Sequence, residues 1–534
     1  VGNLGLTITN FGILGNGWNR MEDGSIHPSC QYKQQTEIAR EQIEHFSYAG
    51  LWVGGIVNGQ RRVSTSIVDG VFEAGNEGFE LFAETPITIQ SSISSTTQDS
   101  MAQYYSPDAV SHQDMIVNFK DYGETESDNM GIPNHNPLGL DINLEAYAWN
   151  YSYADAFAIL NYTFKNMSAD TIHNIYAGIW TDPSVANFNY TDYYTPGGGF
   201  TWYDNLDGFD ETEDAAGFTR DIAYQYDADG DDGWAESYLG VSILGSNIPM
   251  DYLETYYAQW VWTNSSNSDY PAYSMPINDD ERYTKMTSSV PKGTGPEYTS
   301  EGYPATENSW LFLVSAGPIG SIPNADTTAW TLAPGDSCSI AFTVVCALWA
   351  DGFGGDSPGQ RGNLYVNYDW AQKAYDGEDK NRNNILDEGE DVNNNQIIDR
   401  YILPAPPPAP NMYVDIESKK VTLYWQDNSE SFLDPISQEA DFEGYRVYGA
   451  RKTSNETLGE FSILLEIDLE NEIGYNTGFS TVQITNSYGE PDSIFIGDAY
   501  YHYKFENSDI KDGWLNYYAI TAYDQGDPDA NLES

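Results

Sequence analysis

The first eighteen residues, VGNLGLTITNFGILGNGW, alternate apolar side chains with small or polar ones. Leu4, Leu6 and Ile8 fall at every second position, which is typical of a β-strand with one buried face. Aromatic residues make up 14% of the chain, which favours strands, and Gly, Asn, Ser and Thr interrupt the apolar runs, which favours turns. The sequence therefore predicts an all-β protein.

The chain has 534 residues, more than one small domain usually holds. Longer strands begin near residue 138 with LGLDINLEAYAW, and LPAPPPAPN forms a stiff linker between two predicted β-sandwiches. We expect a multi-domain protein with an N-terminal β region at 1–137, a β-sandwich at 138–372 with a long insertion at about 182–305, an acid-rich and amide-rich loop at 373–402, a proline-rich linker at 403–411 and a smaller sandwich at 412–534.

The charge of the chain excludes some partners. Asp and Glu number 81 against 23 Lys and Arg, which gives a net charge of −58. Such a charge repels nucleic acid and anionic lipid but attracts divalent cations. Adaptation to high salt is an alternative explanation, although it does not account for acids clustered in patterned loops. No run of about 18 apolar residues exists, so we expect no membrane span.

One stretch, DKNRNNILDEGEDVNNNQIIDRYI at 379–402, places an acid or amide at every second position without an obvious balancing cation. The first run has the spacing with which an EF-hand-type loop binds Ca²⁺ through six or seven oxygens, with Ile385 giving its carbonyl and packing its side chain inward. A merely solvated acidic turn is the alternative. Positions 1, 3, 5, 7, 9 and 12 are Asp379, Asn381, Asn383, Ile385, Asp387 and Glu390.

A second run repeats this frame twelve residues later, with Asp391, Asn393, Asn395, Ile397 and Asp399 as candidate ligands. Its twelfth position is Ile402, so we expect it to bind weakly or to borrow Glu388 or Glu390. The tandem resembles the calcium loops of dockerin modules and thrombospondin type 3 repeats, which implies a structural Ca²⁺. A third acidic stretch, YDADGDDGWAE, has Asp227, Asp229 and Asp231 at alternate positions. It fits the first half of such a loop but has no acid at position 12, and a solvated Asp-rich turn is the alternative.

Two wider resemblances concern location. Beyond the linker, VTLYWQD, GYRVYGA and LNYYAITAYD resemble the B, C and F strands of a fibronectin type III module, with Trp425, Tyr445, Val447, Tyr517 and Tyr518 at core positions. This implies adhesion or spacing and no catalytic residue. In addition, TNFGILGNGW, AGLWVGG, PLGLDINLEAYAW, YQYDADGDDG and LAPGDS, in this order, are similar to motifs of large secreted bacterial proteins of the type IX secretion kind, which implies an extracellular or cell-surface location.

The three cysteines are Cys30, Cys338 and Cys346. The last two lie in one predicted strand, SCSIAFTVVC, and at ~3.3 Å per residue they are roughly 26 Å apart, too far for a disulfide. Cys30 pairs with one of them, or all three are buried thiols. No cysteine or histidine spacing indicates zinc.

Catalytic patterns are poor, so we expect no enzyme and no catalytic residue. The six histidines are scattered, and neither GxSxG nor HExxH occurs. The aromatic cluster YYAQWVW at 256–262 is suited to stacking on sugars, or it is a buried strand. We expect a secreted structural protein that forms an extracellular fibre, surface layer or adhesive assembly; the alternative is a surface protein that binds or degrades carbohydrate, with surface glycans as partners.

The two ends of the chain give an expectation about assembly. The chain begins at Val1, as a processed mature chain does, and only the acidic QGDPDANLES follows LNYYAITAYD, so a last strand is missing from the final sandwich. An open sandwich accepts a strand from a neighbour. The N-terminal segment LGLTITNFG has the alternation of a donor strand, so we predict that residues 1–9 pair with a neighbouring copy and that the chain self-associates into an open homopolymer. The alternative is a chain that continues past Ser534 and supplies its own strand.

Overall fold

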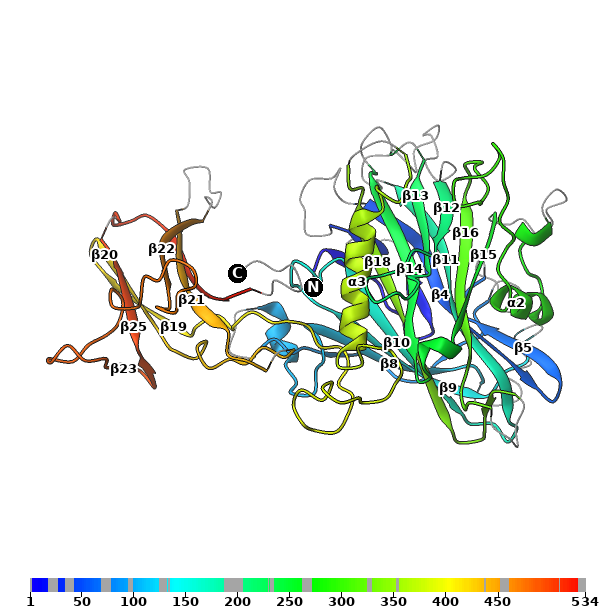
Figure 1. Cartoon of the computed structure of the whole chain (residues 1–534), viewed down its shortest axis with the longest axis horizontal. Coiled ribbons are helices and arrows are strands. Elements are labelled where there is room, and N and C mark those ends of the chain that lie inside the picture. Colours follow the sequence, from blue (N-terminus) through cyan, green and yellow to red (C-terminus); the bar gives the residue numbers. More distant parts are fainter. Residues whose placement is uncertain are drawn as a thin grey trace. The chain divides into compact units, whose positions relative to one another are not determined.

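The computed structural model confirms the all-β prediction (Figure 1). It describes residues 2–17, 27–33, 43–68, 78–94, 99–123, 132, 135–186, 205–228, 230, 235–261, 271–323, 329–351, 355–436, 438–451, 461–508 and 510–526. Among these residues no helix has the length and apolarity needed to cross a membrane.

The chain divides into two compact units. Unit 1 comprises 1–390 and 398–401, and unit 2 comprises 391–397 and 402–534. The division falls inside the loop predicted at 373–402, directly before the proline-rich linker at 403–411.

Unit 1 contains two large antiparallel sheets. The central path of the first sheet runs β1, β3, β4, β11, β16, β15, while β2 and β5 also pair with β4, and β17 pairs with β11. Its strands are β1 (Leu4–Leu6), β2 (Ile13–Gly15), β3 (Cys30–Tyr32), β4 (Ile43–Val57), β5 (Gln60–Thr65), β11 (Ile172–Ala186), β15 (Glu254–Val261), β16 (Trp310–Ile319) and β17 (Thr331–Leu332).

The second sheet has the order β12, β13, β14, β18, β10, β9, β8, β6, and β7 also pairs with β8. Its strands are β6 (Phe82–Ala83), β7 (Thr88–Gln90), β8 (Gln113–Lys120), β9 (Leu140–Ala148), β10 (Phe157–Asn166), β12 (Asn205–Asp210), β13 (Ile222–Asp227), β14 (Ser237–Ser246) and β18 (Ser337–Leu348). The helices are α2 (Asp279–Met286), α3 (Gly362–Asp376) and the 3-10 turns η2 (Ser100–Tyr104), η5 (Met250–Tyr252) and η6 (Pro271–Tyr273).

Each sheet combines strands from segments that we predicted to be separate domains. Strand β4 pairs with β11 and β8 pairs with β9, so the predicted boundary between 137 and 138 does not divide two bodies. The segment 182–305 is not an insertion either, because it supplies β12, β13, β14 and β15 to the two sheets. Hydrogen bonding between strands distant in sequence has no local signal, which is why periodicity alone gave the wrong division.

The core of unit 1 lies between the sheets. Trp52, Trp180 and Trp260 are fully buried, and the rings of Trp52 and Trp260 are 6.1 Å apart. Every residue of β14 is buried on both faces, because α3 packs against β14 and β18 from outside (Figure 1). A strand covered on both faces has a continuous apolar run instead of an alternating one.

A buried arginine fixes the beginning of α3. The side chain of Arg361 has no exposed surface, and its guanidinium pairs with Asp210 on β12, with Glu301 at 2.7 Å and with Asp356 at 3.1 Å. A buried guanidinium is stable only when carboxylates compensate for its lost hydration. These three acids therefore hold α3 on the sheet and position the loop that follows the helix.

Unit 2 contains two three-stranded sheets and a hairpin. The first sheet has the order β19, β20, β25, and the second has the order β22, β21, β26. Trp425, Tyr445 and Val447 are buried in its core, as expected, and Tyr518 packs against it in part, but Tyr517 is 37% exposed, so its expected core position is wrong. The strands are β19 (Met412–Glu417), β20 (Lys420–Trp425), β21 (Phe442–Arg451), β22 (Ser462–Asp468), β25 (Tyr503–Asn507) and β26 (Asn516–Asp524), and the hairpin is β23 (Ile494–Ile496) with β24 (Ala499–Tyr501).

Candidate functional site

The first acidic loop, 379–390, begins just after α3 ends at Asp376. Gly377 has a φ of 55° and its N–H donates to the carbonyl of Lys373, which closes the helix. A Cβ at this position would come within 2.1 Å of the carbonyl oxygen of Asp399, so only glycine fits. The rigid helix therefore fixes where the loop starts.

Side-chain oxygens at alternate positions turn toward the interior of this loop. Asp379 accepts from the N–H groups of Asn383 and Asn384, both at 3.0 Å. The amide oxygen of Asn381 accepts from Asn383 N at 3.1 Å, and that of Asn383 accepts from Ile385 N at 2.7 Å. Each of these short turns leaves the oxygen with a second lone pair.

The last third of the loop folds back onto the first. Glu390 accepts from Lys380 N at 3.1 Å and from Asp387 N at 2.9 Å. Asp387 Oδ2 accepts from the side-chain amides of Asn381 and Asn383, and these bonds lower the pKa of the Asp387 carboxyl. The structure thus brings the carboxylates of Asp387 and Glu390 to the residues at the start of the loop.

The second loop repeats the backbone-to-side-chain bonds of the first half of the first loop. Asp391 accepts from Asn395 N and Gln396 N, the side chain of Asn393 accepts from Asn395 N, and that of Asn395 accepts from Ile397 N. The fourth and sixth positions of both loops have left-handed backbones. Their φ values are 55° at Arg382, 57° at Asn384, 62° at Asn394 and 64° at Gln396.

The ninth residue of the second run, Asp399, belongs to unit 1. Its N–H donates to Glu378 Oε2 at 3.0 Å, just as Asp387 N donates to Glu390 in the first loop. The sequence led us to expect Glu388 or Glu390 in this role. Glu378 was missed because it precedes both runs and no spacing rule includes it.

Two arginines supply cations that the sequence pattern did not reveal. Arg400 Nη2 lies 2.7 Å from Asp379 Oδ2 and 2.5 Å from Asn384 Oδ1. Arg382 donates to Asp376 at 2.9 Å and to Asp214 at 2.6 Å. The premise that these carboxylates have no cation of their own is therefore only partly right, because Asp379 already has one.

The chemistry of the donors fits a hard cation. Carboxylate, amide and carbonyl oxygens are the ligands that Ca²⁺ prefers. However, no three His, Cys, Asp or Glu side chains are grouped closely enough to hold a metal within the described part of the chain. The side chains of Ile385 and Ile397 are 60% and 64% exposed, so the expected inward packing of Ile385 is wrong. No second layer covers the loop there, whereas paired helices would do so in a full EF-hand.

Five of the eleven residues of the other acidic stretch, Asp229 and Asp231 among them, lie outside the described residues. Asp227, at its start, is buried and accepts from Gly230 N at 2.6 Å. The aromatic cluster at 256–262 is partly inside the sheet, since Tyr257 and Trp260 are fully buried.

The N-terminal donor candidate is already used in unit 1. Within residues 1–9, Leu4–Leu6 forms β1, which pairs with β3, and Leu4 and Ile8 belong to the core. A strand with these contacts would have to leave its own sheet before it could join another chain.

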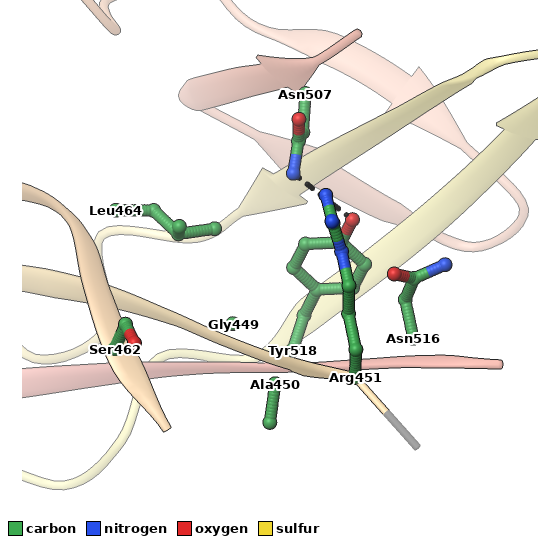
Figure 2. Close-up of a pocket in the computed structure, with 8 residues that line it drawn as sticks. All are labelled: Gly449, Ala450, Arg451, Ser462, Leu464, Asn507, Asn516 and Tyr518. Carbon is green, nitrogen blue, oxygen red and sulfur yellow. Dashed lines mark hydrogen bonds between the residues drawn. The ribbon is translucent and has the colours of Figure 1, made fainter. Parts of the chain in front are cut away.

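Unit 2 has a groove of about 350 Å³ between its two sheets (Figure 2). Tyr518 and Asn516 come from β26, and Asn507 comes from β25 on the other sheet. The side-chain amide of Asn507 donates to the Tyr518 hydroxyl at 3.1 Å, a bond across the groove. Gly449, Ala450, Arg451, Ser462 and Leu464 complete its lining.

Comparison with known proteins adds little to this picture. No family profile matches the sequence, and a search of curated proteins gave no match. Among solved structures, a polysaccharide lyase is similar with a TM-score of 0.21 and 9% identity, over 88% of this chain and 43% of the lyase. A galactose mutarotase-like protein from Clostridium acetobutylicum has a TM-score of 0.20 and 9% identity, over 56% of this chain and 79% of that protein. The chain thus spans less than half the length of the lyase.

Proposed function

We propose that this chain is an extracellular structural protein that assembles with further copies of itself through unit 2. The observation that carries this proposal is β19. All six of its residues are exposed, Ile416 by 75%, and within the described residues β19 pairs with β20 alone. An exposed apolar edge strand is a template for pairing with another chain.

Other apolar groups on unit 2 support the same role. More than half of the exposed large apolar side chains among the described residues lie in 402–534, although unit 1 is far larger. Phe495 on the hairpin is 57% exposed and Ile463 on β22 is 53% exposed. Exposed apolar side chains at this density indicate an interaction surface. A fibronectin type III-like module of the kind that the sequence resembles fits such an adhesive role.

A second copy is the occupant we assign to β19, because backbone pairing of one edge strand with its own copy needs no sequence complementarity. The net charge of −58 opposes this contact, since each copy repels the next. Cations that screen or bind the acids therefore favour assembly, and this connects assembly to the two acidic loops.

Calcium is the cation we assign to the loops at 379–390 and 391–397. Asp379, Asn381, Asn383, Asp387 and Glu390 would hold it in the first loop, with Asp391, Asn393 and Asn395 in the second. When bound, it would neutralise the carboxylates and hold their oxygens in one shell. The repeated hydrogen bonds and left-handed positions support this assignment.

The calcium assignment is tested by limited proteolysis of the full chain around 376–402. We expect chelator to accelerate cleavage there and calcium, but not sodium at equal ionic strength, to restore protection. Asp387→Ala should abolish the calcium response, while Asp336→Ala, which removes the same charge at an exposed turn outside both loops, should keep it. If neither chelator nor Asp387→Ala changes the rate of cleavage around 376–402, the assignment is refuted.

Assembly is tested by sedimentation velocity in calcium. The full chain should sediment as larger species at higher concentration, and Ile416→Lys should reduce them because it places a charge on the pairing edge. Val366→Lys adds the same charge on α3 of unit 1, where the side chain is 55% exposed, and should leave assembly unchanged. If the two variants sediment alike, or if the full chain is a monomer at every concentration, the proposal is refuted.

Carbohydrate binding is the second candidate. Tyr475, Tyr488 and Trp514 are 74%, 88% and 59% exposed, and exposed aromatic faces stack on sugar rings. Affinity electrophoresis in polysaccharide gels tests this: retardation that Tyr488→Ala and Trp514→Ala abolish supports it, and unchanged migration in every polysaccharide speaks against it.

A further inference from the structure

Two cysteines from different sheets of unit 1 meet in its interior. Cys30 begins β3 of the first sheet and pairs in register with Leu6, and Cys346 lies in β18 of the second sheet opposite Leu239. Both side chains are fully buried as free thiols, each is part of the same hydrophobic core, and each thiol is near enough to the other to shift its pKa. The pair therefore joins segments 316 residues apart in the sequence.

His45 on β4 completes this cluster. Its Nδ1 lies 2.9 Å from the carbonyl oxygen of Ile43, and because a carbonyl only accepts, Nδ1 carries the proton. Nε2 lies 3.0 Å from Ser237 Oγ on β14. His45 is also close enough to the Cys346 thiol to lower its pKa. The His45–Ser237 bond links the same two sheets, so the two cysteines are held in place by a second contact between sheets.

The two thiols differ in acidity. Burial alone would raise the pKa of Cys346, but the hydrogen bond from Cys30 and the charge and hydrogen bond of His45 bring it down to about 6. Burial and the neighbouring Cys346 raise the pKa of Cys30. In the closed core the thiolate, which is the form that attacks in disulfide exchange, is therefore favoured on Cys346.

The third cysteine provides an internal comparison. Cys338 is buried on the same strand as Cys346, and burial alone raises the pKa of its thiol to about 12. Eight residues along β18 separate it from Cys346. Burial of a thiol alone therefore does not lower its pKa as the neighbours of Cys346 do.

We propose that Cys30 and Cys346 form a disulfide that ties the two sheets of unit 1 together. The oxidant is a small-molecule or protein disulfide. The thiolate of one cysteine attacks one of its sulfurs and releases the other as a thiolate; the thiolate of the second cysteine then attacks the protein sulfur of the mixed disulfide and releases the second thiolate. The two protons lost by the cysteines are taken up by the two released thiolates. Because both thiols are buried in the folded chain, this exchange precedes closure of the sheets or follows their opening.

The test refolds the full chain in a mixture of reduced and oxidised glutathione, then denatures it and blocks free thiols with N-ethylmaleimide. Mass spectrometry should show one alkylated cysteine, Cys338, and a non-reduced digest should contain a peptide pair joined through Cys30 and Cys346. Three alkylated cysteines, or a bridge that includes Cys338, would overturn the proposal. This readout uses the natural sequence, so it does not depend on whether a variant folds.

A stability measurement gives an independent check. Dithiothreitol should lower the urea midpoint of the oxidised chain, because a disulfide restricts the unfolded state most when it closes a long loop. Cys338→Ala should respond to dithiothreitol like the natural chain, and Cys30→Ser should not respond. A midpoint of the natural chain that dithiothreitol does not change contradicts the proposal. Neither readout depends on calcium or on assembly.

Discussion

Arg400 pairs with Asp379 while its guanidinium lies over the ring of Tyr375, 4.6 Å from the ring centroid. The side chain of Asp379 is 1% exposed and that of Arg400 is 19% exposed, so water screens this pair only weakly. Tyr375 belongs to α3. A single arginine therefore connects the first ligand position of the acidic loop to the helix before it.

Removing this guanidinium should make the loop depend more strongly on calcium. We expect Arg400→Met to destabilise the loop by about 3 kcal/mol in chelator, because a nearly buried carboxylate loses its partner. Calcium should recover much of this loss. Proteolysis rates around 379–390, with and without calcium, measure both effects. Arg446→Met, which breaks the Arg446–Glu466 pair in unit 2, is the control, and an equal calcium response in both variants would contradict the prediction.

The second prediction concerns a buried acid in unit 1. Burial raises the pKa of Asp207 to about 8, although Gln225 Nε2 donates to it at 2.6 Å. Between its ordinary pKa near 4 and this value, the folded chain keeps a proton that the unfolded chain releases. Asp207 therefore makes the free energy of unfolding fall as pH rises from about 4 to about 8.

Asp207→Asn removes this titration. We expect the variant to be more stable than the natural chain by about 2 to 4 kcal/mol at pH 8, and the difference to shrink toward pH 4. Urea unfolding across this pH range measures it. The free energy of unfolding of Asp336→Asn, a variant at an exposed turn, should change with pH in the same way as that of the natural chain. A difference for Asp207→Asn that does not change with pH would show that Asp207 is ionised in the folded protein.

The third prediction uses the division into two units. Trp425 is fully buried in unit 2, where its ring lies 5.8 Å from that of Tyr445 and 5.6 Å from that of Tyr503. Trp425→Ala should cost about 3 to 5 kcal/mol, because it leaves a cavity in a small core. Calorimetry should show a lower transition temperature for unit 2 alone. Trp180→Ala should affect the other transition, and movement of both transitions in either variant would argue against separate units.

The fourth prediction concerns the sixth position of the second loop. Gln396 has a φ of 64°, a conformation that glycine adopts without cost. Gln396→Gly should stabilise this loop by about 0.5 to 1 kcal/mol, whereas Gln396→Ala should not. Hydrogen exchange at Asn395, Gln396 and Ile397, whose N–H groups donate within the loop, reports the change. Faster exchange in the glycine variant would mean that the Gln396 side chain holds the loop.

The sequence predicted local structure better than long-range structure. The strands at 140–148 and 337–348 were visible because apolar runs end at turn residues, and the loop pattern at 379–397 was visible because its spacing is local. The joining of 1–137 with 138–372 was not visible, because β4 and β11 meet only in the folded chain. The same reason explains why Glu378, Arg400 and the meeting of Cys30 with Cys346 had no signal in the sequence.

The position of β18 has a consequence for how the protein is made. This strand lies between β14 and β10 in the second sheet but is supplied by residues 337–348. A growing chain cannot close the sheet until these residues have left the ribosome or, in an exported protein, have crossed the membrane. Until then β10 and β14 lack the strand that pairs with both of them. Unit 1 therefore folds late and as a whole, and during this interval Cys30 is open to the oxidant.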